Sequence, residues 1–137
     1  MKTVAILYAS LFASAAFAKD PAGVKIECRN LEFREMTSLY VATHDDPKQD
    51  GNSSPGGVGM GSVWEIHVNG KNREDGYVGP EENDGHRFTG WGVSVGKRNF
   101  RITKKGADSA QIIEMDKNWK EQVGDATGDC TVEKNPY

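Results

Sequence analysis

Glu65 and His67 stand two residues apart in the segment SVWEIHV. In an extended strand this spacing places both side chains on the same face. A carboxylate and an imidazole on a sheet, together with a cation such as Arg101, are the groups that an RNA-cleaving site uses. One group takes the proton of the 2′-hydroxyl, and the cation stabilises the charge of the phosphorane. The segment therefore raises the hypothesis of a ribonuclease-like protein, active or degenerate.

The rest of the chain does not complete this chemistry. Fungal guanyl-specific ribonucleases supply their catalytic histidine late, near the C-terminal cysteine, and the last histidine here is His86. The histidines do not have the short spacing of metal ligands, and the acidic segment Glu81–Asp84 lacks the alternation and closing Glu of a calcium loop. No Gly-x-Ser-x-Gly or Gly-Lys-Ser/Thr motif is present. We therefore expect no catalytic residues, no bound metal and no cofactor, and a protein that is not an enzyme.

A second chemical feature is the basic segment GWGVSVGKRNFRITKKG, from Gly90 to Gly106. One interpretation is a solvated outer face of a β-hairpin. The other is a local positive patch that steers an acidic protein partner. The chain as a whole has 17 Lys and Arg against 20 Asp and Glu, a net charge of −3, so we do not expect nucleic acid as a partner. The candidate partner-binding residues are Lys97, Arg98, Arg101, Lys104 and Lys105.

Three aromatic residues could act as stacking platforms in a carbohydrate-binding module: Trp64, Tyr77 and Trp91. Trp64 alternates in phase with Ile66, and Trp91 with Val93. This alternation places both tryptophans on the inward face of their strands. Burial of the two rings counts against a carbohydrate-binding function.

The compartment follows from the N-terminus and the cysteines. Lys2 precedes an apolar run from Val4 to Phe17, and the small residues around Ala18 fit a signal-peptidase site, so residues 1–18 are predicted to be a secretory signal peptide. The alternative is an uncleaved N-terminal anchor. The mature chain, 19–137, is expected to be a single secreted domain, monomeric and without a membrane segment.

Cys28 and Cys130 are the two cysteines of the chain. In an oxidising compartment such a pair is expected to form a disulfide, the alternative being two free or intermolecular thiols. The disulfide would close a loop of about a hundred residues and would place the first strand beside the last segment. Asn52-Ser53-Ser54 is a sequon, which makes Asn52 a candidate glycosylation site.

The fold class follows from the period of two in the apolar residues. Gly is frequent, with 16 residues, and helical periodicity is scarce. Strands are predicted at 24–28, 39–42, 63–68, 91–95, 100–103 and 110–115, with at most a short strand near Tyr77. Asp129–Glu133 is predicted to be a short strand or extended tail, and 45–61 a flexible loop. We expect an all-β protein, a small antiparallel sandwich or barrel of about six short strands with one disulfide.

The signal peptide, the strand pattern from Val24 to Met115 and the early position of Cys28 resemble small secreted effectors of plant-pathogenic fungi. Among these the chain most resembles the ToxB-like group called MAX effectors. The resemblance implies a sandwich of two three-stranded sheets with a disulfide from the first strand. It also implies binding to host proteins, partly through exposed strand edges, and no catalytic residues. Cys130 departs from the family pattern, in which the partner cysteine lies nearer the middle of the domain.

We therefore expect a secreted, non-enzymatic binding protein of the effector or virulence type, which acts on a host or extracellular protein. An exposed strand edge and complementary charge would provide the contact. A ribonuclease-like protein and a carbohydrate-binding module are the two alternatives.

Overall fold

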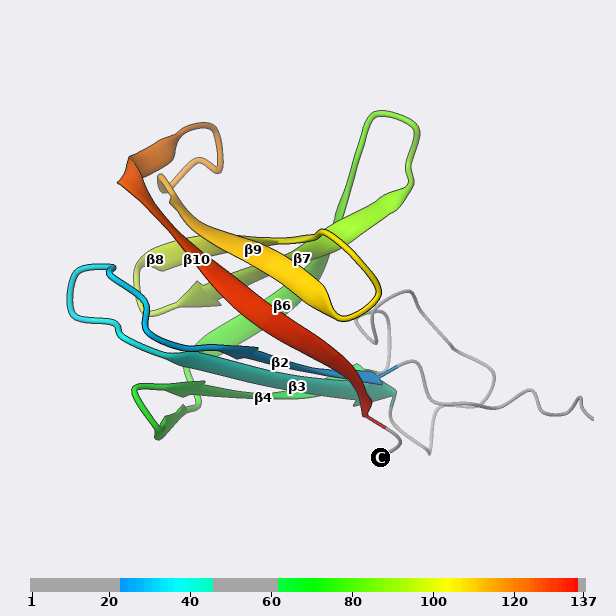
Figure 1. Ribbon diagram of the computed structural model, residues 1–137, viewed down its shortest axis with the longest axis horizontal. Helices are drawn as coiled ribbons and strands as arrows, with labels where there is room; N and C mark the ends of the chain where they lie inside the picture. Colours follow the sequence, from blue (N-terminus) through cyan, green and yellow to red (C-terminus); the bar gives the residue numbers. More distant parts are fainter. Residues whose placement is uncertain (1–22, 46–61, 136–137) are drawn as a thin grey trace, which may run out of the picture.

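The computed structural model describes residues 23–45 and 62–135, and these residues form nine antiparallel strands (Figure 1). The predicted signal peptide, the sequon at Asn52 and all but the first residue of the predicted 45–61 loop lie outside the described residues. No helix within the described ranges is long and apolar enough to cross a membrane. The strands are β2 (Gly23–Cys28), β3 (Leu39–Asp45), β4 (Ser62–Val68), β5 (Lys71–Arg73), β6 (Gly76–Glu82), β7 (Phe88–Val95), β8 (Arg98–Lys104), β9 (Ser109–Met115) and β10 (Gln122–Asn135).

The all-β class is confirmed, but the predicted number of about six strands is too low. The polar β5 follows the Asn69-Gly70 turn and has no apolar alternation. In β6 the residues Gly79 and Pro80 interrupt the pattern, and the strand still extends over seven residues. β10 extends over 14 residues, of which the sequence predicted only the part near Asp129–Glu133. Its polar first half pairs with β9 alone. Apolar alternation detects strands with a buried face, and these segments bury few side chains.

All nine strands belong to one sheet, in the order β5-β4-β3-β2-β10-β9-β8-β7-β6. The two three-stranded sheets implied by the resemblance are therefore wrong. The long strand β10 is the physical reason: it pairs with β9 through Gln122–Thr131 and with β2 through Cys130–Asn135. In Figure 1 it runs diagonally between the two halves and joins them. The sheet curls until β4 approaches β6, which gives a nearly closed barrel.

The barrel interior contains most of the apolar residues that the alternation predicted to point inward, and Trp64 is an exception. The largest fully buried side chains include Trp91, Phe100, Ile26, Ile66, Ile102 and Ile112. Burial of this apolar surface provides the main favourable free energy of folding. The described part of the chain leaves no buried side-chain nitrogen or oxygen without a hydrogen-bond partner.

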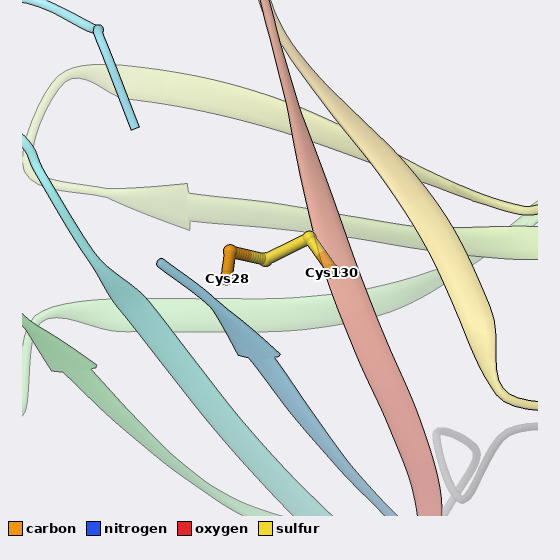
Figure 2. The surroundings of a disulfide bond; sticks show 2 residues. All are labelled: Cys28 and Cys130. Carbon is orange, nitrogen blue, oxygen red and sulfur yellow. A yellow bond between two sulfur atoms is a disulfide. The ribbon is translucent and has the colours of Figure 1, made fainter. Parts of the chain in front are cut away.

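The predicted disulfide between Cys28 and Cys130 is confirmed (Figure 2). The two residues face each other directly in the β2–β10 pairing, and both are buried. The bond therefore fixes the first described strand to the last one, at the place where the two halves of the sheet meet.

The segment 29–38, which connects β2 to β3, folds across one end of the barrel and buries Leu31, Phe33 and Met36. Asn69 in the β4–β5 turn holds this segment. Its amide oxygen accepts hydrogen bonds from the N–H of Thr37 at 2.8 Å and of Ser38 at 3.3 Å, and its Nδ2 donates to the carbonyl of Glu35 at 3.1 Å. The turn itself has positive φ at Asn69 and Gly70, 53° and 81°, as the Asn-Gly sequence predicts.

Candidate functional site

The five basic residues of the hairpin lie at three different places. Lys97 belongs to the two-residue turn between β7 and β8, and Lys104 and Lys105 lie at the opposite end of β8. Arg98 and Arg101 lie between these ends and both form ion pairs. The structure therefore does not gather the five cations into one patch, and their role in partner binding stays a prediction.

Arg98 connects three segments of the barrel. Its Nε and Nη2 donate to the two carboxylate oxygens of Glu114 in β9 at 3.0 and 2.9 Å, and its Nη1 donates to the carbonyl of Arg34 at 2.6 Å. The guanidinium also lies 5.3 Å from the ring centre of Phe100. The hydrogen bond to Glu114 raises the pKa of Arg98. These contacts hold segment 29–38 against the barrel.

Arg101 lies on the outer face of β8 and donates from Nε to Glu81 in β6 at 3.1 Å. Its Nη2 lies 3.4 Å from the carbonyl oxygen of Trp119. The Trp119 ring covers the outer face of Gly92, where a β-carbon would meet it at 3.2 Å. Arg101 thus fastens the β9–β10 turn to the outer surface of the sheet.

Glu65 and His67 do share a face of β4, as their spacing predicts. Glu65 Oε2 and His67 Nε2 lie 2.6 Å apart, and the His67 ring meets Tyr40 edge to face at 5.6 Å between centroids. His67 and Tyr40 border a surface depression of about 380 Å³ that also includes Arg29. Arg101, the cation that the ribonuclease hypothesis combined with this pair, instead contacts Glu81.

The three histidines do not converge. His44 is in β3, His67 in β4, and His86 in the β6–β7 loop, 3.6 Å from Glu82. Within residues 23–45 and 62–135 no group of three or more His, Cys, Asp or Glu residues could hold a metal ion.

Trp91 is buried, as predicted, but the prediction that Trp64 points into the core is wrong, because 37% of it is exposed. β5 pairs only with Ile66–Val68, so the first half of β4 has no described neighbour on that side. The Trp64 ring instead reaches across the gap between β4 and β6. Its Nε1 donates to the carbonyl of Gly76 at 3.2 Å, and its ring meets Tyr77 edge to face at 5.1 Å.

We call Val63, Trp64 and Tyr77 the seam patch, because they lie on the strands on either side of this gap. They are 39%, 37% and 58% exposed, and they are three of the four large exposed hydrophobic residues of the described chain; the fourth is Val123 in β10. Beside them β6 is a terminal strand of the sheet, with a described strand partner on one side only. Pro80 within β6 is consistent with this position, since proline in sheets occurs almost exclusively on edge strands.

Two features of these surfaces have no signal in the sequence. The exposure of Trp64 depends on how much of β4 the short strand β5 covers, and the Arg73–Asp75 ion pair of 2.7 Å lies against the hairpin turn at Gly96, far away in sequence. The charged residues Arg73 and Asp75 gave no indication of this contact in the sequence. No protein-family model, curated protein or solved structure matches the chain.

Proposed function

We propose that this protein is a secreted, non-enzymatic binding protein of the small-effector type, which docks on a host or extracellular protein through the seam patch and the adjacent edge of β6. The observation that carries the proposal is the exposed aromatic pair Trp64 and Tyr77 beside a strand with an open edge. The finer assignment to the MAX effectors remains a proposal, supported by the all-β architecture and the buried disulfide from the first strand.

Two physical properties make this surface suited to a protein partner. Tryptophan and tyrosine provide a large apolar area with few rotatable bonds, so they dominate the binding free energy in many interfaces. An open strand edge presents backbone N–H and C=O groups with which an extended segment of a partner can pair. The part of the β6 edge open to a partner is short, because the carbonyl of Gly76 already accepts a hydrogen bond from Trp64 and Pro80 has no N–H to donate.

A site-specific crosslinking experiment tests the proposal. The photoreactive residue p-benzoylphenylalanine replaces Tyr77 in one variant and Val123 in a matched control, since both residues are exposed and apolar. After irradiation in plant extract we expect a discrete protein adduct with the Tyr77 variant and none with the control. The adduct should disappear when excess unmodified protein competes, and should persist when the competitor carries Tyr77→Ala. Equal labelling at the two positions, or no discrete adduct at position 77, would contradict the proposal.

A second candidate function is cleavage of phosphodiester bonds at Glu65 and His67. The observation that favours it is the 2.6 Å contact of these residues at the rim of a depression that also contains Arg29 and Tyr40. The test is RNA cleavage by the purified mature protein, compared with His67→Ala and with the exposed control His86→Ala. Cleavage that only His67→Ala abolishes would replace the non-enzymatic proposal; no cleavage above background is the result we expect.

The carbohydrate-binding alternative gains the exposed ring of Trp64 but loses Trp91, which is buried. Trp64 and Tyr77 meet at an interplanar angle of 81°. Two rings nearly at right angles do not offer one flat platform to a sugar ring. Retention on chitin or cellulose beads that Tyr77→Ala removes would favour this alternative.

A further inference from the structure

The capped end of the barrel contains a depression of about 200 Å³, between segment 29–38 and the turn that joins β7 to β8. Its floor is apolar and consists of Met36, Val95 and Phe100, which are 1%, 4% and 1% exposed. The ring of Phe100 also packs near that of Phe33, with ring centres 5.8 Å apart. In Figure 1 this end, with the cyan 29–38 segment, lies opposite the end at which β10 finishes.

Three cations line the same depression: Arg73, Lys97 and Arg98. The only carboxylate among its lining residues is Glu35. The lining residues therefore include three cationic side chains and one carboxylate. Mouths of β-barrels are also frequent positions for small-ligand sites.

Two of the cations are held in fixed positions by acidic side chains. Arg73 donates from Nε and Nη2 to Asp75 at 3.0 and 2.7 Å, and the hydrogen bond to Arg73 lowers the pKa of Asp75. Arg98 is held by Glu114, as described above. Together with Glu35, these two acids balance the formal charge of the three cations. They nevertheless leave two directed donors, Nη1 of Arg73 and the ammonium of Lys97, without a hydrogen-bond partner among the described residues.

The size and chemistry of the depression define the ligand. A volume of 200 Å³ equals that of about seven water molecules, which suits one aromatic ring or one branched aliphatic group. Drug-sized ligands need roughly 300 Å³ or more. A guanidinium and an ammonium beside an apolar floor match a carboxylate attached to such a group. The carboxylate of Glu35 opposes ligands with a higher negative charge, such as phosphomonoesters.

We infer that the mouth of the barrel binds a small monocarboxylate with a single aromatic or branched apolar group. The apolar group lies on Met36, Val95 and Phe100, and the carboxylate accepts hydrogen bonds from Lys97 and from Nη1 of Arg73. This site is separate from the seam patch and does not depend on the function proposed for that surface.

The test is an NMR titration of the ¹⁵N-labelled mature protein with N-acetyl-phenylalanine. We expect saturable shifts of the amide signals of Met36, Gly96 and Lys97. N-acetyl-phenylalanine amide, which lacks the carboxylate, and acetate, which lacks the apolar group, should give no saturable shift in the same range. Saturation by the amide to the same degree, or shifts spread over the whole protein, would overturn the inference.

Matched charge reversals complete the test. Lys97→Glu and Lys105→Glu make the same change at opposite ends of the hairpin, and both residues are exposed. We expect Lys97→Glu to weaken the binding of N-acetyl-phenylalanine by about 10-fold or more and Lys105→Glu by less than about 2-fold. An equal effect of the two reversals would show a non-specific charge effect and contradict the site. Tyr77→Ala should leave this binding unchanged, so the two proposals can fail separately.

Discussion

Arg98 forms an ion pair with Glu114 in the structure, whereas the sequence predicted it as a surface charge for partner binding. Replacing Arg98 by Ala removes both hydrogen bonds to Glu114 and the one to the Arg34 carbonyl. Because Glu114 is left partly buried without its partner, we expect the free energy of unfolding to fall by about 1–3 kcal/mol. Urea unfolding measures this change, and Lys104→Ala on the same strand should stay within about 0.5 kcal/mol of the unmodified protein.

A double-mutant cycle of Arg98→Ala with Glu114→Ala separates the pair from other effects. If the contact stabilises the fold, the effects of the two replacements are not additive. Additive effects would mean that the ion pair contributes nothing measurable, as is common for exposed pairs.

Asp116 gives the fold a predictable dependence on pH. Its Oδ1 accepts hydrogen bonds from the N–H groups of Lys120 at 2.9 Å and Asn118 at 3.0 Å, and the bond from Lys120 is the main cause that lowers the pKa of Asp116. Since the folded pKa lies below the unfolded one, the resulting stability is present above the unfolded pKa. It is lost as the pH falls through the folded pKa.

The variant Asp116→Asn tests this linkage because it keeps an oxygen acceptor and removes the charge. We expect its urea midpoint to lie below that of the unmodified protein at pH 7, and the difference to vanish at a pH below the usual range of aspartate. The exposed Asp84→Asn is the control. A difference that is independent of pH would show that the charge of Asp116 is not responsible.

Gly90 controls the geometry of one element, strand β7. It lies at a register shift between β6 and β7 and has a φ of 157°, and a β-carbon there would collide with the carbonyl oxygen of Ile102. Gly90→Ala should therefore lower the free energy of unfolding by about 1–3 kcal/mol, because the neighbouring strand β8 has to move. Thermal or urea unfolding measures the loss.

Gly85→Ala is the matched control, since Gly85 lies in the exposed loop between β6 and β7 and a β-carbon there would meet no atom closer than 3.4 Å. Its effect should be smaller than about 1 kcal/mol. Similar effects of Gly90→Ala and Gly85→Ala would contradict the role assigned to Gly90 at the register shift.

The elements that the sequence predicted well share one property, a buried face. In β8 the alternation of Phe100 and Ile102 with polar neighbours was sufficient; both apolar residues are buried, and the neighbours are only partly buried. In β6 only Val78 is buried, and the strand exists because the backbone of β7 pairs with it. Such pairing depends on a partner distant in space and leaves no periodic signal in the strand itself. The same reason explains Trp64, whose exposure depends on the length of β5.

At the scale of the whole molecule the disulfide is the strongest single constraint. Cys28 and Cys130 are separated by 102 residues, and in the chain-entropy model a loop of that length gives a stabilisation of about 4–5 kcal/mol. We expect reduction under native conditions to lower the free energy of unfolding by about 4–5 kcal/mol, as measured by urea unfolding. The double variant Cys28→Ser with Cys130→Ser should unfold like the reduced protein, and the reductant should not change its urea midpoint. A change in that midpoint would mean that the reductant destabilises the protein by a route other than this disulfide.

The sequence predicted a sandwich or a barrel, and it could not decide between these two architectures. Alternation identified which residues point inward, and the two cysteines predicted that the first strand lies beside the last segment. Neither observation indicates that β10 is long enough to pair with β9 through its first part and with β2 through its last part. This double pairing joins the two halves of the sheet. The depression at the mouth of the barrel could not be predicted from the sequence either, since Arg73, Lys97 and Met36 line it from three separate segments.

The pairing of β2 with β10 has a further consequence for protein engineering. Gly23 and Asn135 are partners in the register, so a short linker could join them, and new chain ends could be opened in the β8–β9 turn at Gly106. In such a circular permutant the disulfide would close a loop of about 15 residues, and its contribution would fall to about 3 kcal/mol. The permutant should keep the fold and lose less stability on reduction, which would separate the effect of the bond on chain entropy from its effect on packing.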